Sequence, residues 1–136
     1  MKRSTGFGKS AVVKAVIGAL MAAMVMKFFI LDIMIAEGHS MAPAIRPGNV
    51  LLVCRVFYGV RLPGSESYLV RWRVPREGDI VVFYTPLEEI AVKRCAEILN
   101  GNMFYFLGDN GSQSYDSRNY GSIPFNNVIG KVLGIK

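Results

Sequence analysis

The stretch EIAVKRCAEILNGNMFYFL, residues 89–107, decides the fold of this 136-residue chain. On both sides of the Asn100-Gly101 pair it is rich in β-branched and aromatic side chains, which favour β-strands. Asn and Gly both tolerate the positive φ angles that a tight hairpin turn demands. The stretch therefore predicts an antiparallel hairpin with strands over residues 89–99 and 103–107.

The hairpin also predicts a register. With a two-residue loop, Leu99 faces Asn102. Counting back six residues along the first strand places Lys93 opposite Gly108. Gly108 opens a loop over residues 108–121 that is unusually polar for so apolar a chain. We therefore expect a basic side chain beside a polar loop.

The remainder of the chain after residue 28 has the composition of short strands separated by turns. Turn residues punctuate it at Arg46-Pro47-Gly48-Asn49, Leu62-Pro63-Gly64-Ser65 and Glu77-Gly78. Further strands are predicted over residues 30–36, 50–57, 79–84 and 128–135. The fold class is therefore mainly β, a single small antiparallel domain over residues 29–136.

The N-terminal part is almost wholly apolar from residue 11 to 36, with an unbroken run over 15–26. A bilayer crossing needs about 20 apolar residues, and Lys14 and Lys27 can extend their ammonium groups to the headgroups. We predict one transmembrane helix over residues 10–28. A cleaved signal peptide would need small residues at −3 and −1, which Met24-Val25-Met26 and Met34-Ile35-Ala36 supply poorly, and a buried soluble helix would show a polar face. Both remain alternatives.

Charge gives the orientation of this anchor. The formal net charge is +6, and residues 1–27 contribute five basic residues and no acidic one. Basic flanks stay on the cytoplasmic side, so residues 1–9 are predicted inside and the β domain on the outer face of the plasma membrane. The β domain itself is nearly neutral, which argues against a nucleic-acid partner.

Cysteine and histidine usage predicts no metal site and no cofactor. Cys54 and Cys95 lie in apolar runs, as two buried thiols would, although one disulfide is possible in an exported domain. The only histidine, His39, directly precedes Ser40. Neighbours on an extended segment point to opposite faces, which argues against a Ser-His-Asp triad.

A lysine is the other side chain that can activate a serine hydroxyl. It acts as a base only when its ammonium group loses a proton near neutral pH, and burial lowers a lysine pKa in this way. Lys93 is flanked by apolar residues on the predicted strand. The pattern alone leaves open a solvated lysine on an edge strand.

Four motifs in order resemble those of the type I signal peptidases, which are Ser-Lys proteases. They are Glu37-Gly38-His39-Ser40-Met41-Ala42-Pro43, Gly78-Asp79-Ile80-Val81-Val82-Phe83, Val92-Lys93-Arg94, and the run from Gly108-Asp109-Asn110 through Ser114 to Asp116-Ser117-Arg118. The resemblance covers nearly the whole chain from about Lys9. It implies a compact member without the extra β domain that larger members carry after the Lys-Arg pair.

The resemblance implies roles for these residues. Ser40 would be the nucleophile and Lys93 its general base, with Ser114 hydrogen-bonded to Lys93. The supporting residues would be an Asp116–Arg118 ion pair, with Asp109 and Asn110 holding the loop backbone. The Ser40 backbone N–H would stabilise the oxyanion. Gly38 offers no side-chain donor at a position where some members have a serine.

The implied function is removal of N-terminal signal peptides with small residues at −1 and −3 by a membrane-anchored, monomeric serine endopeptidase. Alternatives are a peptidase dedicated to one exported or pilin-like substrate and an inactive anchored scaffold. The substrate pocket is predicted to include Ile33, Ile35, Ala36, Tyr84 and Val92. Aromatic and apolar residues expected to rest on the lipid bilayer, or to pack inside the fold, are Phe28, Phe29, Tyr68, Leu69 and Trp72.

Overall fold

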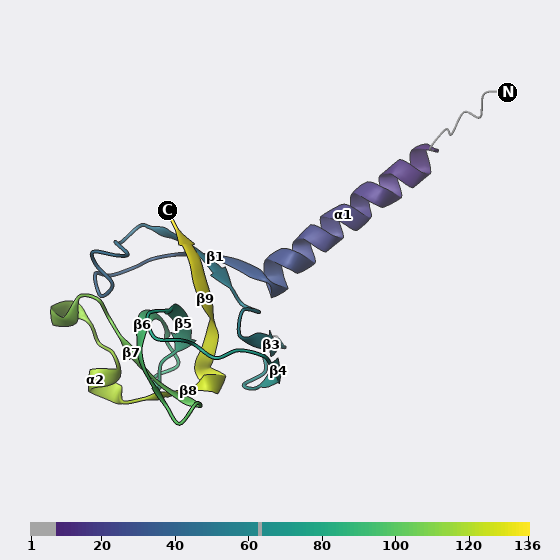
Figure 1. Ribbon diagram of the computed structural model, residues 1–136. Helices are drawn as coiled ribbons and strands as arrows, with labels where there is room; N and C mark the ends of the chain where they lie inside the picture. The colour runs from purple at the N-terminus through teal and green to yellow at the C-terminus, as the bar shows by residue number, and fades with distance from the viewer. Residues whose placement is uncertain (1–7, 63) are drawn as a thin grey trace.

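A computed structural model describes residues 8–62 and 64–136, without the side chain of Phe28. It begins with one long helix, α1 (Lys9–Phe29), which projects away from a β domain (Figure 1). Residues Lys9–Lys27 are apolar enough to span a membrane, with a mean hydropathy of 1.7, and none of this window is buried. Residues 1–7 of the predicted inner flank, which include Lys2 and Arg3, lie outside the described residues.

Nine strands follow within the described residues. They are β1 (Leu31–Ile35), β2 (Val50–Cys54), β3 (Gly59–Arg61), β4 (Tyr68–Arg71), β5 (Ile80–Tyr84), β6 (Ile90–Leu99), β7 (Met103–Leu107), β8 (Ile123–Pro124) and β9 (Val128–Ile135). A short helix, α2 (Ser117–Tyr120), and 3-10 turns at Gly111–Gln113 and Phe125–Asn127 complete the fold. The prediction of a mainly β chain with an N-terminal apolar helix is confirmed.

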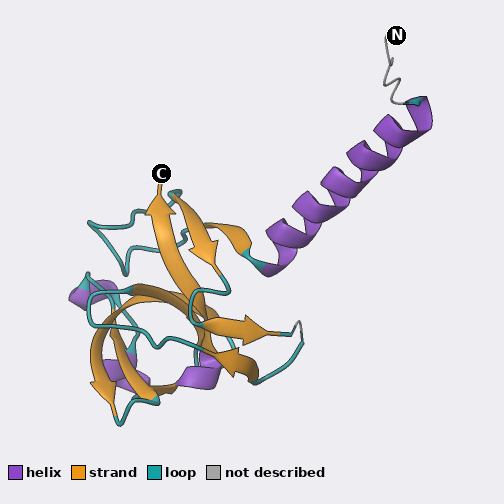
Figure 2. Ribbon diagram, turned by 45° about the vertical axis from the view of Figure 1, so that its right-hand side comes forward, coloured by secondary structure: helices purple, strands orange, loops and turns teal. Residues whose placement is uncertain are grey.

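Seven strands form one antiparallel sheet in the order β1-β2-β9-β5-β6-β7-β8, which curls on itself (Figure 2). β3 and β4 form a separate hairpin. Curling gives the sheet an inner face that can be filled with apolar side chains, which is how a domain of this size obtains a core.

Two clusters of buried side chains fill the interior. One is aromatic and includes Tyr58, Phe83, Phe104, Phe106 and Phe125. The other is aliphatic and lies beside the segment that carries Ser40; it consists of Met41, Ile45, Leu51, Val53, Val82, Ile129 and Val132. The aliphatic cluster fixes that segment to the sheet, because Met41 and Ile45 are 4% and 2% exposed.

The β6–β7 hairpin has the predicted turn but a different register beside it. Asn100 and Gly101 both have positive φ, 51° and 67°. The ladder nevertheless pairs Leu99 with Met103, one residue later than expected. A β-bulge at Ala96 removes this offset, so that Arg94 pairs with Leu107 as the two-residue loop would give.

Four strands were predicted too long and three strands were missed. β1, β5 and β6 begin one residue later than predicted, β1 also ends one residue earlier, and β2 ends at Cys54 rather than at residue 57. β3, β4 and β8 have weak strand signals. β3 starts at Gly59, where a Cβ atom would overlap the backbone of Val70, so glycine is needed for the close approach of β4.

Candidate active site

Ser40 lies in the turn after β1, and its backbone is tied to the polar loop. Its carbonyl oxygen accepts a hydrogen bond from the backbone N–H of Asn110 at 2.9 Å. The following residues Met41 and Ile45 are buried in the aliphatic cluster. The serine is therefore held from two sides. The adjacent His39 is exposed.

Lys93 extends from the middle of β6, where it is paired with Val81 of β5. The lysine is 6% exposed, and its Nζ donates a hydrogen bond to Ser40 Oγ at 2.7 Å. Ser40 and Lys93 are 53 positions apart in the chain. The sheet therefore brings a hydroxyl and a buried amine into direct contact.

Burial lowers the pKa of Lys93, and the nearby Asp116 carboxylate opposes this effect. A lysine that loses its proton more readily can accept one from a hydroxyl. The direction of the shift is the one required for a base. The hydrogen bond to Ser40 Oγ and the lowered pKa of Lys93 are both features that a lysine base requires.

Asp116 accepts hydrogen bonds from several residues of the polar loop, and its side chain is fully buried. Its Oδ2 accepts hydrogen bonds from the Gly108 backbone N–H at 2.9 Å and from Ser114 Oγ at 2.6 Å. The Arg118 guanidinium binds both carboxylate oxygens. Burial alone would raise the pKa of Asp116, but these hydrogen bonds hold the pKa well below its usual range. The carboxylate is therefore a fixed negative charge.

Ser114 is placed differently from the implied role. Its hydroxyl donates to Asp116 and, among the described contacts, makes no hydrogen bond with Lys93. The loop nevertheless packs closely against Ser40, because Gly108 has no side chain. A Cβ atom at Gly108 would overlap Ser114 Oγ and would lie 2.5 Å from the Ser40 carbonyl oxygen.

The other two loop residues hold the backbone in different ways. Asp109 forms a two-pronged ion pair with Arg94 of β6, at 2.8 Å from Nε and 2.7 Å from Nη2. Asn110 acts through its backbone N–H on Ser40, while its side chain bonds Ser112 and Gln113 within the loop. Arg94 was not among the predicted site residues, although it follows Lys93 directly in the motif.

Ser40 and Lys93 lie in a cleft of about 310 Å³. Of the five predicted pocket residues, Ala36 and Val92 line it. Ile33 and Ile35 are 61% and 69% exposed, because they alternate with Met34 and Ala36 on the opposite side of β1. The sequence reasoning also missed Tyr115, which lines the cleft and lies between Ser114 and Asp116.

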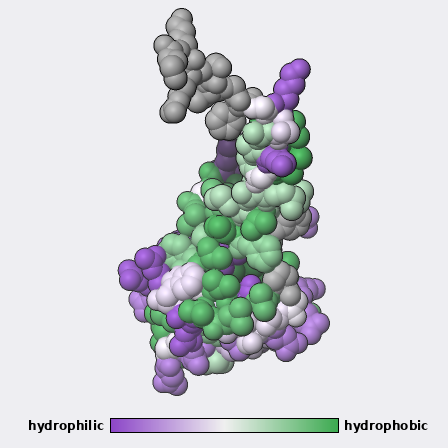
Figure 3. All heavy atoms as spheres, turned by 90° about the vertical axis from the view of Figure 1, so that its right-hand side faces the viewer, coloured by the Kyte–Doolittle hydropathy of each residue, from purple (hydrophilic) through white to green (hydrophobic). Residues whose placement is uncertain are grey.

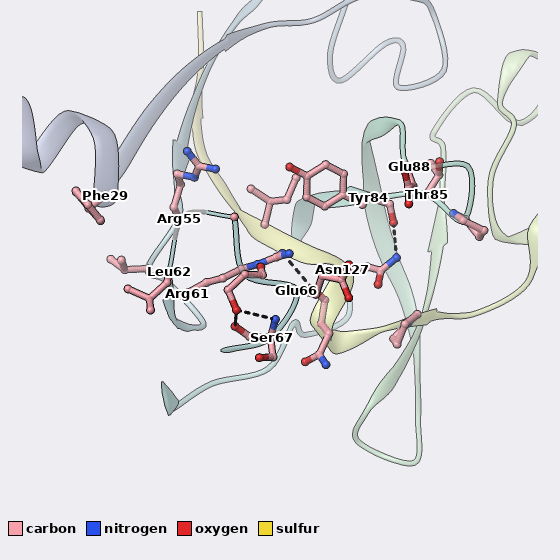
Figure 4. A pocket seen from close by; sticks show the side chains of 17 residues that line it. Phe29, Arg55, Arg61, Leu62, Glu66, Ser67, Tyr84, Thr85, Glu88 and Asn127 are labelled. Atoms are coloured by element: carbon pink, nitrogen blue, oxygen red, sulfur yellow. Dashed lines mark hydrogen bonds between the residues drawn. The ribbon is translucent and has the colours of Figure 1, made fainter. Parts of the chain in front are cut away.

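A larger cavity, of about 1120 Å³, lies at the base of α1 and contains neither Ser40 nor Lys93 (Figure 4). Tyr84, the fifth predicted pocket residue, lines this cavity together with Phe29, Arg55 and Leu62. It is open and mixed in polarity. The smaller cleft holds the reactive pair and is the candidate active site.

Two further sets of predicted residues can be placed. Cys54 and Cys95 are both buried and free, and burial raises the pKa of the Cys95 thiol to about 11. Phe29, Leu69 and Trp72 are 45%, 61% and 52% exposed. Tyr68 instead packs against Phe125, and its hydroxyl donates to the Val128 carbonyl oxygen at 2.7 Å.

A serine hydroxyl hydrogen-bonded to a buried lysine in a cleft is the arrangement found in hydrolases that use a lysine as base. The family comparison agrees with this class. The chain matches the signal peptidase family, peptidase S26, over residues 9–98 and 91–135, and it belongs to that family.

Individual relatives share the similarity over different lengths. Signal peptidase I of Bacillus caldolyticus is 23% identical over 79% of this chain and 80% of its own length. Mitochondrial inner membrane protease subunit 1 of Xenopus tropicalis is 31% identical over 76% of this chain and 68% of its own. Signal peptidase I of Buchnera aphidicola subsp. Baizongia pistaciae is 36% identical over 46% of this chain, but only a fifth of that protein, 20%, is spanned.

Proposed function

We propose that this protein is a membrane-anchored serine endopeptidase that removes signal peptides from exported preproteins. The observation that carries the proposal is the 2.7 Å hydrogen bond between Lys93 Nζ and Ser40 Oγ, made by a lysine whose burial lowers its pKa. The names of relatives in the family, signal peptidase I among them, supply the substrate class.

The acylation step follows from this pair. Neutral Lys93 accepts the hydroxyl proton as Ser40 Oγ attacks the scissile carbonyl carbon. The tetrahedral intermediate collapses when the C–N bond breaks and the leaving amine takes the proton from Lys93. A serine ester of the signal peptide remains, and the mature chain departs with a free amino terminus.

Deacylation uses the same base. Lys93 removes a proton from a water molecule, the hydroxide oxygen attacks the ester carbon, and the proton returns to Ser40 Oγ as the acid is released. The Ser40 backbone N–H has no acceptor among residues 8–62 and 64–136, so it is available for the oxyanion. Gly38, with a φ of 76°, contributes no side-chain donor there.

The polar loop serves to position this pair. Asp116 and Arg118 compensate each other's charge, Ser114 and Gly108 are hydrogen-bonded to Asp116, and the loop backbone reaches Ser40 through Asn110. Asp109 joins the start of the loop to β6 through Arg94. These contacts fix the approach of a hydroxyl to an amine, which is the contribution that orientation makes to catalysis.

The cleft supports selection of small side chains. Ala36 lines one wall, and Ala91 and Val92 of β6 line another. An extended signal peptide can lie between these segments, with small residues at −1 and −3 turned toward the apolar walls. No metal or cofactor takes part in this proposal.

The helix α1 supports anchoring in a membrane. Its apolar surface continues onto the face of the domain below it (Figure 3). Phe29, at its end, shares the larger cavity with Leu62. We propose a single-pass protein with residues 1–9 on the cytoplasmic side, a span over 10–28, and residues 29–136 outside. The domain is proposed to act as a monomer.

A dedicated processing peptidase is the second candidate. The 31% identity to a mitochondrial inner membrane protease subunit, over 68% of that protein, shows that the chain is also similar to a membrane protease that is not named a signal peptidase. A panel of unrelated secretory preproteins separates the two. Cleavage of many of them supports a general peptidase, whereas cleavage of one supports a dedicated enzyme.

The catalytic proposal is tested with Ser40→Ala and Lys93→Met in the full chain, purified in detergent. We expect cleavage of a preprotein whose signal ends in Ala-x-Ala to fall by roughly a thousandfold or more in each. Lys136→Met removes a lysine at the C-terminus and controls for loss of charge. If either variant, shown to be folded by circular dichroism, cleaves the preprotein at the rate of the unaltered protein, the assignment is contradicted.

Anchoring is tested separately on the full chain in sealed inverted membrane vesicles. We expect the protein to resist alkaline carbonate extraction and its β domain to be protected from added protease. Release by carbonate would contradict the anchor. Digestion of the domain without detergent would contradict the orientation.

A further inference from the structure

Tyr115 is an exposed aromatic side chain inside the cleft that holds Ser40 and Lys93. It is 61% exposed, although it lies between two residues that are fixed by hydrogen bonds, Ser114 and Asp116. An exposed aromatic ring beside a reactive pair is available for binding, because a ligand that covers it removes apolar surface from water and gains contact with the ring. Nothing in the acyl-transfer steps uses this ring.

The ring is held in place from behind. Tyr115 meets the ring of Tyr120 edge-on, with centroids 5.5 Å apart and an angle of 62° between planes. Tyr120 ends helix α2 and packs against the aromatic core cluster. Asp116 and Asn119 cap that helix reciprocally. The ring is therefore pre-organised, and covering it costs little side-chain entropy.

Tyr115 lines the same cleft as Ser40 and is connected to it through the polar loop. One wall of the cleft is formed by Glu89 and by β6 as far as Lys93, and Lys93 contacts Ser40. Tyr115 follows Ser114, whose hydroxyl packs against Gly108, and Gly108 in turn abuts the Ser40 carbonyl. A signal peptide that runs along this wall toward Lys93 would bring its scissile bond to Ser40. The released chain would then continue toward the loop that carries Tyr115.

We propose that Tyr115 is a specificity-determining residue that contacts the first residue of the released chain, at +1, and favours an aromatic or large apolar side chain there. The inference rests on the proposed function. Lys93 must give its proton to the leaving amine, so the +1 nitrogen lies next to Lys93 and its side chain lies within reach of the loop that carries Tyr115. Contacts between aromatic rings correspond to a preference of about threefold to tenfold.

The test uses the full chain in detergent and peptides with Ala at −1 and −3 that differ only at +1, carrying Phe, Leu, Ala or Asp. For the unaltered protein we expect kcat/KM to be about threefold to tenfold higher with Phe than with Ala at +1. Tyr115→Ala should bring this ratio close to one, and Tyr115→Phe should keep it. Trp72→Ala removes a similarly exposed ring outside the cleft and should also keep it.

The outcomes separate the two proposals. Equal cleavage of all four peptides by the unaltered protein, or an unchanged ratio in Tyr115→Ala, would overturn the role of Tyr115 while leaving the peptidase intact. Failure of the unaltered protein to cleave any peptide would overturn the proposed function and this inference with it.

Discussion

The Arg118 guanidinium covers both oxygens of the buried Asp116 carboxylate, with Nε 2.9 Å from Oδ1 and Nη2 2.6 Å from Oδ2. The Asp116 charge raises the pKa of Lys93 against the lowering effect of burial. An arginine paired with that carboxylate offsets its charge. We therefore expect Arg118 to favour loss of the Lys93 proton through Asp116.

Arg118→Gln should make the base work at higher pH. With the Asp116 charge less compensated, the pKa of Lys93 rises, so a smaller fraction is neutral at pH 7 and the rising limb of kcat/KM moves to more alkaline pH. We expect a fall of about threefold to tenfold at pH 7, with recovery at pH 10. Arg76→Gln, an exposed site with the same charge change, is the control. A profile of unchanged shape would rule out this electrostatic role.

Asp116→Asn should shift the rising limb of the pH profile of kcat/KM toward lower pH, because it removes the negative charge that raises the pKa of Lys93. It should also destabilise the fold. The amide oxygen can replace only part of a carboxylate that accepts from Gly108, Ser114 and Arg118, and an unsatisfied buried partner costs about 1–3 kcal/mol. Urea unfolding in detergent measures this cost. Stability equal to that of the unaltered protein would be inconsistent with the hydrogen-bonded geometry.

Gly108→Ala tests how tightly the loop is packed against the reactive pair. The added methyl group would overlap Ser114 Oγ and press on the Ser40 carbonyl, so the loop must move away. Overpacking of this kind typically costs 1–3 kcal/mol, and we expect cleavage to fall by about a hundredfold. In Gly134→Ala the methyl group meets only Leu52 Cβ, at 4.0 Å, and activity should be retained. Comparable activity in both variants would refute the tight packing.

The two cysteines should remain free thiols that react slowly. Burial raises the pKa of Cys95 to about 11, so the reactive thiolate is scarce at pH 8. We expect iodoacetamide to label neither Cys54 nor Cys95 in the folded protein and both in guanidinium chloride, as read by mass spectrometry. A disulfide between them under non-reducing conditions would contradict the free, buried state.

The sequence predicted strand bounds well where aromatic and β-branched residues fill the strand, and poorly where they do not. β7 and β9 have the predicted bounds because aromatic and β-branched residues fill them. β3 begins with a glycine that is chosen for close packing rather than for strand propensity. Such a strand exists only because its partner is present, which local reasoning does not reveal.

The contacts of some site residues were predicted from the sequence and those of others were not. Chemical elimination argued only against the histidine, and the resemblance to family motifs implied the pairing of Ser40 with Lys93. The structure places Ser40 Oγ and Lys93 Nζ 2.7 Å apart. The partner of Ser114 does not follow in the same way, since Asp116 competes for its hydroxyl at 2.6 Å. Pocket residues on β1 depended on which way the strand faces, and a one-residue choice reverses that direction.

The bulge at Ala96 divides β6 into two halves with opposite alternation. Cys95 and Ile98 both reach the aromatic cluster although an odd number of positions separates them, which a regular strand does not allow. The half that carries Lys93 is thus fixed by β5 and by the polar loop, independently of the hairpin tip. We therefore expect residues inserted at Asn100-Gly101 to leave the Lys93 amine in place.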